Sequence, residues 1–238
     1  MTDKELYESL SYERKNVYLK LTDKERSEMT ELCDSYRVFL DRGKTERECV
    51  NESVKMAEAA GFIDMDKTDS LKPGDKVYKV NRNKNIFMAV IGTEDIRNGV
   101  NIAGAHIDSP RLDLKQNPLY ESMDMALLKT HYYGGVRKYQ WVTLPLALCG
   151  VVCKRNGDVI RVEIGNNPED PIFYISDLLP HLAKDQKEIS GEELNIIVGS
   201  KPDSEADDQP YKTAILKLLN EKYGITEEDF ETADLSLV

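Results

Sequence analysis

The sequence of residues 102–110 is Ile-Ala-Gly-Ala-His-Ile-Asp-Ser-Pro, and this stretch governs our interpretation of the chain. Residues 100–105 are mostly small or apolar and predict a strand that runs directly into His106. Side chains two positions apart on an extended backbone point to the same face. We therefore expect His106 and Asp108 to face one site at a strand's end, where an open α/β sheet places its ligands. Imidazole is a common zinc ligand, and a neighbouring carboxylate fixes its tautomer. The alternative is a buried histidine that hydrogen-bonds to a nearby aspartate.

Helical patterns and then strand patterns precede this stretch. Asp23 is a helix cap for a segment with apolar residues at helical spacing, which stops at Gly43. The capping box at residues 45–48 opens a second helix that ends at Gly61. Residues 76–80 and 85–91 alternate as strands. We expect the helices to cover one face of a sheet, in an α/β or α+β arrangement.

The pattern changes beyond about residue 112, where short strand-like segments dominate. The pair Asn156-Gly157 predicts a tight hairpin. We expect strands at 123–132, 141–154, 159–164, 194–198 and 230–238, and helices at 176–182 and 211–223. Residues 200–210 are acidic and are expected to form a mobile loop.

Charge and composition exclude several classes of protein. The 238 residues carry 32 Lys and Arg against 43 Asp and Glu, so the net charge is −11. Nucleic-acid binding and adsorption to anionic membranes need clustered basic residues, so we expect neither partner. The N-terminal residues lack the pattern of a signal peptide. The four scattered cysteines indicate reduced thiols and a cytoplasmic protein.

Several longer blocks resemble one enzyme family. They are AHIDSPRLDLKQNPLYE at residues 105–121, LLKTHYYGG at 127–135, KYQW at 138–141, and the segments 178–182 and 191–195. Together they resemble the bacterial branch of the aspartyl aminopeptidase family of two-metal zinc aminopeptidases. The resemblance implies an α/β fold in which a β-rich dimerisation domain interrupts the catalytic domain. On this basis residues 1–112 form the N-terminal part of the catalytic domain. Residues 113–228 form the dimerisation domain, and residues 229–238 begin the return.

The resemblance also implies roles for individual residues. His106 would ligate one of two divalent metal ions, zinc by default with cobalt or manganese as alternatives. Asp108 would be the carboxylate that supports this ligand. By block position His181 is the candidate for a histidine that reaches the active site of a partner subunit, while His131 is expected to be structural or interfacial. The pair Glu192-Glu193 is expected to be surface charge or a helix start rather than a catalytic pair.

Two functions follow from the family, and a third does not depend on it. The first is a metallo-aminopeptidase that hydrolyses N-terminal residues from peptides and forms a homodimer or larger homo-oligomer. This sequence would be its N-terminal portion, because the family's other ligands and its Glu-Glu catalytic pair are expected after Val238. The second is a truncated, non-catalytic dimerisation module. The third is a small-ligand binding protein with a structural His-Asp pair.

Overall fold

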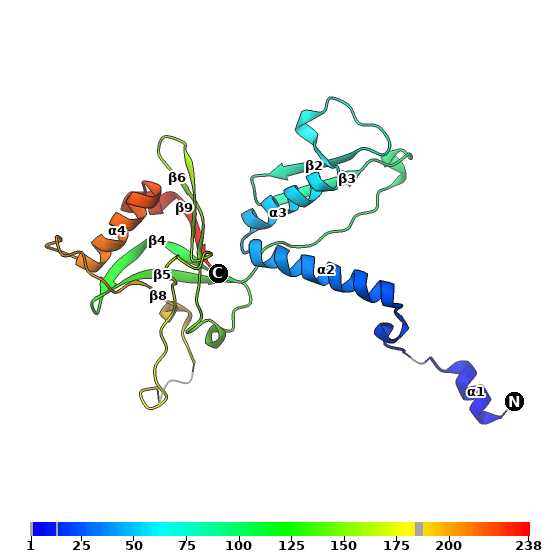
Figure 1. The fold of residues 1–238 in the computed structure, drawn as a ribbon, viewed down its shortest axis with the longest axis horizontal. Coiled ribbons are helices and arrows are strands. Elements are labelled where there is room, and N and C mark those ends of the chain that lie inside the picture. The colour runs from blue at the N-terminus through cyan, green and yellow to red at the C-terminus, as the bar shows by residue number, and fades with distance from the viewer. Residues whose placement is uncertain (1, 13, 184–187) are drawn as a thin grey trace. The chain divides into compact units, whose positions relative to one another are not determined.

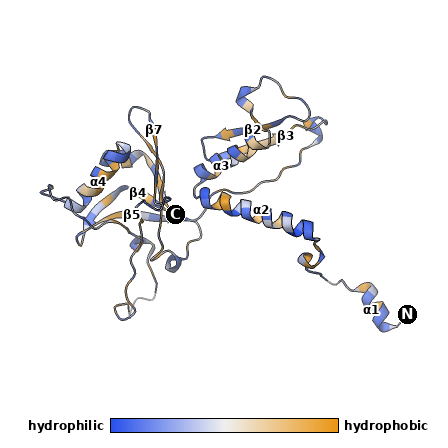
Figure 2. Cartoon of the chain, in the orientation of Figure 1, coloured by the Kyte–Doolittle hydropathy of each residue, from blue (hydrophilic) through white to orange (hydrophobic). Residues whose placement is uncertain are grey.

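The computed structural model describes residues 2–12, 14–183 and 188–238, and the chain divides into the units Met1–Arg42 and Gly43–Val238. The first unit contains α1 (Asp3–Leu10), a 3₁₀ turn (Val17–Lys20) and α2 (Asp23–Arg42) (Figure 1). Thr22, not Asp23, caps α2, because its backbone N–H and hydroxyl both donate to Glu25. No residue of α2 is buried. Figure 2 shows that α2 is mainly hydrophilic.

The second unit begins with one helix and a small sheet. The carboxylate of Glu48 accepts the backbone N–H groups of Lys44 and Thr45, both at 3.1 Å, so the predicted capping interaction opens α3 (Glu46–Ala59). The helix packs on a three-stranded sheet of order β1-β2-β3, formed by Ile63–Asp64, Lys76–Asn81 and Asn85–Val90. The strands predicted at 76–80 and 85–91 are therefore confirmed.

The rest of this unit is built on a six-stranded sheet of order β7-β6-β9-β4-β5-β8, in which every neighbouring pair is antiparallel. Its strands are β4 (Arg111–Ser122), β5 (Met125–Tyr133), β6 (Leu148–Cys153), β7 (Val159–Ile164), β8 (Ile196–Gly199) and β9 (Ala233–Leu237). The predicted hairpin joins β6 to β7, with Gly157 at a φ of 91°. β9 comes last in the chain but lies in the middle of the sheet.

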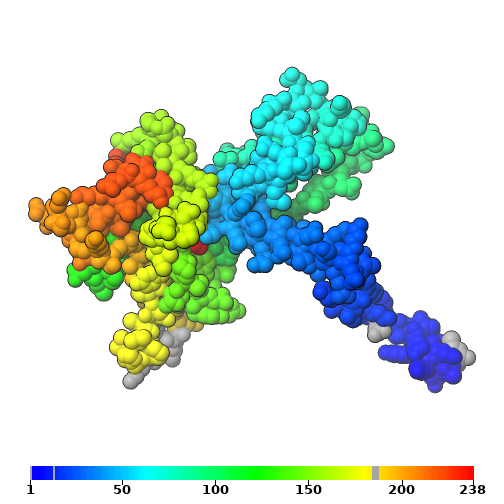
Figure 3. Space-filling view, in the orientation of Figure 1, coloured from blue at the N-terminus to red at the C-terminus, as the bar shows by residue number. Residues whose placement is uncertain are grey.

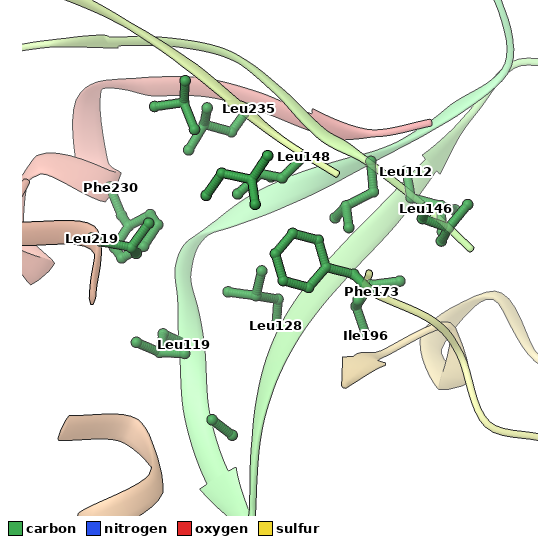
Figure 4. Packing of buried hydrophobic residues seen from close by; sticks show 14 of the residues in the cluster. Leu112, Leu119, Leu128, Leu146, Leu148, Phe173, Ile196, Leu219, Phe230 and Leu235 are labelled. Carbon is green, nitrogen blue, oxygen red and sulfur yellow. The ribbon is translucent and has the colours of Figure 1, made fainter. Parts of the chain in front are cut away.

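The hydrophobic core lies between this sheet and α4 (Pro210–Tyr223). Leu112, Leu128, Leu148 and Leu235 from four strands converge with Leu219 of α4 (Figure 4). Each such side chain contributes about 1.5–3 kcal/mol by leaving water. The core fixes the position of β4, and therefore of the segment that leads into it.

Three expected elements were wrong. Residues 100–110 form no regular structure, and Ile102 is 85% exposed, because in the described part of the chain no strand pairs with them. Residues 176–182 form no helix. Pro180 has no backbone N–H, so inside a helix it would leave one backbone hydrogen bond unmade. The strand expected at 141–154 begins at Leu148, and two isolated bridges replace its first half. Within the described ranges no helix is long and apolar enough to cross a membrane.

Candidate metal-ligand site

His106 and Asp108 lie side by side in the extended segment that precedes β4. The Nδ1 atom of His106 is 2.9 Å from the backbone carbonyl oxygen of Asp108 and 3.2 Å from its Oδ1. Both oxygens accept hydrogen bonds only, so a neutral His106 ring carries its proton on Nδ1 and leaves the Nε2 lone pair free. The His106 side chain is 85% exposed. The predicted pair therefore comes together with one ring nitrogen available to a ligand.

The second carboxylate oxygen of Asp108 has its own partner. The phenol of Tyr133, the last residue of β5, donates to Oδ2 over 2.9 Å. This hydrogen bond holds the pKa of Asp108 below its ordinary value. The same bond raises the pKa of Tyr133, since ionising the phenol would place two negative charges together. Each carboxylate oxygen of Asp108 therefore has one partner, His106 at Oδ1 and Tyr133 at Oδ2.

Sheet pairing places Tyr133 at this position. Tyr133 is the cross-strand partner of Arg111, the first residue of β4. The guanidinium carbon of Arg111 lies 4.0 Å from the centre of the Tyr133 ring, a cation–π contact. Gly134, at a φ of 80°, lets the chain turn away immediately after Tyr133, and a Cβ there would lie 3.6 Å from Pro110. The end of β5 therefore packs closely on the His106–Pro110 segment.

Arg111 is itself held by two carboxylates. Its Nε donates to Asp113 over 2.7 Å, and its terminal nitrogen donates to Glu46 of α3 over 3.0 Å. Ser236 of β9 donates to the same Asp113 oxygen over 2.7 Å. Burial alone would lower the pKa of Arg111, but Asp113 and Glu46 outweigh it and raise the pKa. The sequence alone singled out neither Tyr133 nor Arg111, although both lie in the blocks that carry the family resemblance.

The other candidate residues lie elsewhere. His181 lies in an exposed turn at residues 180–182, and in the described part of the chain it hydrogen-bonds to neither His106 nor Asp108. Residues 176–183 extend away from the strands of the six-stranded sheet (yellow in Figure 1), and the same segment is yellow in the space-filling view of Figure 3. His131 is exposed on β5 and stacks on Tyr132 with the ring centres 5.2 Å apart.

The paired glutamates have structural partners. Glu192 pairs with Lys115 at 2.5 Å. Glu193 accepts the backbone N–H of Ser190 over 3.0 Å at the start of a short 3₁₀ helix. The expectation of surface charge at a helix start is confirmed.

The donor set fits part of a metal centre. His106, with a carboxylate at Nδ1 and a free Nε2, has the arrangement that second-shell carboxylates give to metal-bound histidines. Zinc takes about four ligands. Among residues 2–12, 14–183 and 188–238, no three His, Cys, Asp or Glu side chains are grouped to hold a metal ion. The described residues fit one ligand position and its support, and not a whole coordination sphere.

Comparison with known proteins places these observations in a family. The family model for aminopeptidase I zinc metalloproteases (M18) matches residues 39–238. A probable M18 family aminopeptidase 1 of Clostridium acetobutylicum is 50% identical over 237 residues, covering 95% of this chain and 51% of the relative. The corresponding protein of Thermotoga maritima is 43% identical over 233 residues, covering 96% and 51%.

Solved structures agree with these sequence matches. The crystal structure of the M18 aminopeptidase from Thermotoga maritima superposes with a TM-score of 0.89 at 42% identity, covering 96% of this chain and 51% of that one. Aminopeptidase I from Borrelia burgdorferi gives a TM-score of 0.84 at 37% identity, covering 94% and 52%. These matches confirm the expected α/β fold class. The chain spans about half the length of the curated relatives it matches.

Proposed function

Because this chain belongs to the M18 family of aminopeptidase I zinc metalloproteases, we propose that it forms part of an aminopeptidase that removes N-terminal residues from peptides. His106 supplies one ligand to a centre of two divalent metal ions, with zinc favoured over cobalt or manganese. Asp108 supports that ligand. The observation that carries this proposal is the pairing of Nδ1 with Asp108, which leaves Nε2 free to bind a metal.

The remaining metal ligands, in this proposal, come from the half of the relatives that this chain does not span. The absence of any three-donor group among the described residues supports this division. It also favours a second function for these 238 residues by themselves, which is assembly without hydrolysis.

Under either function we propose the same division into domains. Residues 1–112 belong to the catalytic domain and residues 113–228 to the dimerisation domain. Residues 229–238, which contain β9, would lead back to the catalytic domain.

We propose a homodimer or larger homo-oligomer that acts in the cytoplasm. His181 is our candidate for the residue that reaches substrate bound in a partner subunit. Its exposure in the projecting segment 176–183 supports this role, because a side chain held in the core of its own subunit could not reach a neighbour.

A fusion tests the proposal. This chain is joined to the C-terminal half of the Clostridium acetobutylicum relative, and zinc-dependent hydrolysis of aspartyl and leucyl peptides is measured. We expect an active fusion, an inactive 238-residue chain, and loss of activity in the fusion with His106→Ala. The control is His131→Ala, which removes an exposed histidine that, within the described residues, forms no hydrogen bond with Asp108, and this variant should keep activity. Activity that survives His106→Ala, or hydrolysis by the 238-residue chain alone, would contradict the proposal.

A further inference from the structure

We propose that Tyr133 is a positioning residue, which holds the Asp108 carboxylate and through it sets the orientation of His106. A residue of the six-stranded sheet would thus determine the orientation of His106, which lies outside the sheet. This inference rests on the proposed role of His106 as a metal ligand.

The geometry at Asp108 carries the first step. Its Oδ1 faces His106 Nδ1 at 3.2 Å, and its Oδ2 accepts the Tyr133 phenol at 2.9 Å. A carboxylate held at one oxygen can still rotate about its terminal torsion, which is broad for aspartate. A second hydrogen bond on the other oxygen removes that freedom. Tyr133 therefore determines where Oδ1 is presented to the imidazole.

Tyr133 is rigid enough for this task. Its backbone is paired with Arg111 in the sheet, and the Arg111 guanidinium covers its ring at 4.0 Å. Arg111 is tied in turn to Glu46 at 3.0 Å and to Asp113 at 2.7 Å. Contacts thus run without a break from α3 and β4, through Arg111 and Tyr133, to Asp108 and His106.

The neighbouring tyrosine offers a matched control. Tyr132 precedes Tyr133 on the same strand and stacks on His131. In the described residues it forms no hydrogen bond with Asp108. Tyr133→Phe and Tyr132→Phe each delete one phenol oxygen and keep the ring. If Tyr133 were merely packing material, the two variants would behave alike.

The first readout needs no metal. The chain has three histidines, so long-range ¹H–¹⁵N spectra of the imidazoles are simple to assign with single His variants. At about pH 8.5, well above the ordinary imidazole pKa of ~6.5, these spectra report which ring nitrogen carries the proton. We expect His106 to be protonated on Nδ1 in the wild-type chain. Tyr133→Phe should populate the Nε2–H tautomer, and Tyr132→Phe should not.

The second readout adds the metal alone. Paramagnetic Co²⁺ is titrated into the 238-residue chain, and broadening is followed separately at each histidine. His106 should broaden at the lowest concentration, and Tyr133→Phe should raise that concentration at least about tenfold, as losses of second-shell partners do. Asp108→Asn should have the same effect. The double variant should add nothing further, because Tyr133 acts through Asp108.

The outcomes separate the two proposals. An unchanged tautomer and unchanged Co²⁺ response in Tyr133→Phe, with His106 still the preferred site, overturns the positioning role alone. A tautomer change without preferential Co²⁺ binding at His106 supports the positioning role and contradicts the ligand role. Additive effects of Tyr133→Phe and Asp108→Asn also overturn the inference. Amide spectra of each variant verify that it is folded.

Discussion

Replacement of Arg111 by methionine removes the contacts that join Tyr133 to Glu46 and Asp113, and so tests how much these contacts stabilise the fold. The Arg111 side chain is 10% exposed and donates to Glu46, which is 16% exposed, and to Asp113, which is 35% exposed. Hydrogen bonds to charged groups contribute about 1.5–3 kcal/mol each. Removing one partner of a buried ion pair costs about 3–5 kcal/mol, because the other charge stays behind. Since Asp113 is partly solvated and keeps Ser236, we expect a loss of about 3 kcal/mol in the free energy of unfolding.

The control is the same substitution at Arg161. That side chain is 54% exposed and also faces two carboxylates, Glu163 at 2.9 Å and Glu48 at 3.6 Å. Exposed pairs contribute about 0.2–1 kcal/mol. Urea unfolding followed by the fluorescence of Trp141, the single tryptophan, measures both variants. With a slope of about 2–3 kcal/mol per molar, Arg111→Met should lower the midpoint by roughly 1–1.5 M. If Arg111→Met costs no more than Arg161→Met, the reasoning is refuted.

Three further predictions concern the sheet and the thiols. Gly150→Ala would place a Cβ 2.0 Å from the Asp234 carbonyl oxygen and should prevent folding, while Gly157→Ala, with nothing within 4 Å, should cost only about 1 kcal/mol for its positive φ; yields of soluble protein and melting curves test both. Burial tends to raise the pKa of Asp234, but Lys84 and Arg47 outweigh it and lower the pKa. The ionised Asp234 should therefore stabilise the fold above about pH 4, and this contribution to the free energy of unfolding should disappear as the pH falls through the lowered pKa of the folded state. Acid unfolding of Asp234→Asn should therefore be less steep than that of the wild type, and equal slopes would contradict this. Cys49 and Cys149 are buried, and burial raises the pKa of the Cys49 thiol and raises that of Cys149 to about 12. A thiol reagent should therefore modify only the exposed Cys33 and Cys153 in the folded chain, and all four cysteines after unfolding. Fast reaction of all four in the folded chain would contradict the structure.

Local signals predicted the elements that depend on nearby residues. The capping box joins Thr45 to Glu48, and the hairpin at Asn156-Gly157 joins Cys153 to Val159. Each involves only groups close together in the chain, so the local sequence contains the signal for both. The strand expected at 100–105 depends on a partner. A strand is stable only when another strand takes up its backbone hydrogen bonds, and in the described residues none lies beside this segment.

The pairing of Tyr133 with Arg111 could not be predicted for a different reason. Ser122 pairs with Met125 beside the turn at Met123-Asp124. If that register continued along both strands without interruption, Arg111 would lie opposite Val136. An irregularity between Leu114 and Leu119 shifts the pairing by three residues. An odd shift exchanges the faces of a strand, so this irregularity decides which side chain meets Asp108. Pro118 lies within this irregularity and has no N–H to donate, so it indicates a bulge, but it does not indicate that the shift is three residues.

A crystal structure of the fusion grown with zinc tests the central claim most directly. An anomalous map at the zinc edge locates the metal independently of activity. We predict a zinc ion about 2.0–2.1 Å from Nε2 of His106, with Asp108 on Nδ1 and the Tyr133 phenol on the far oxygen of Asp108. Zinc bound with His106 outside its coordination sphere would contradict the claim.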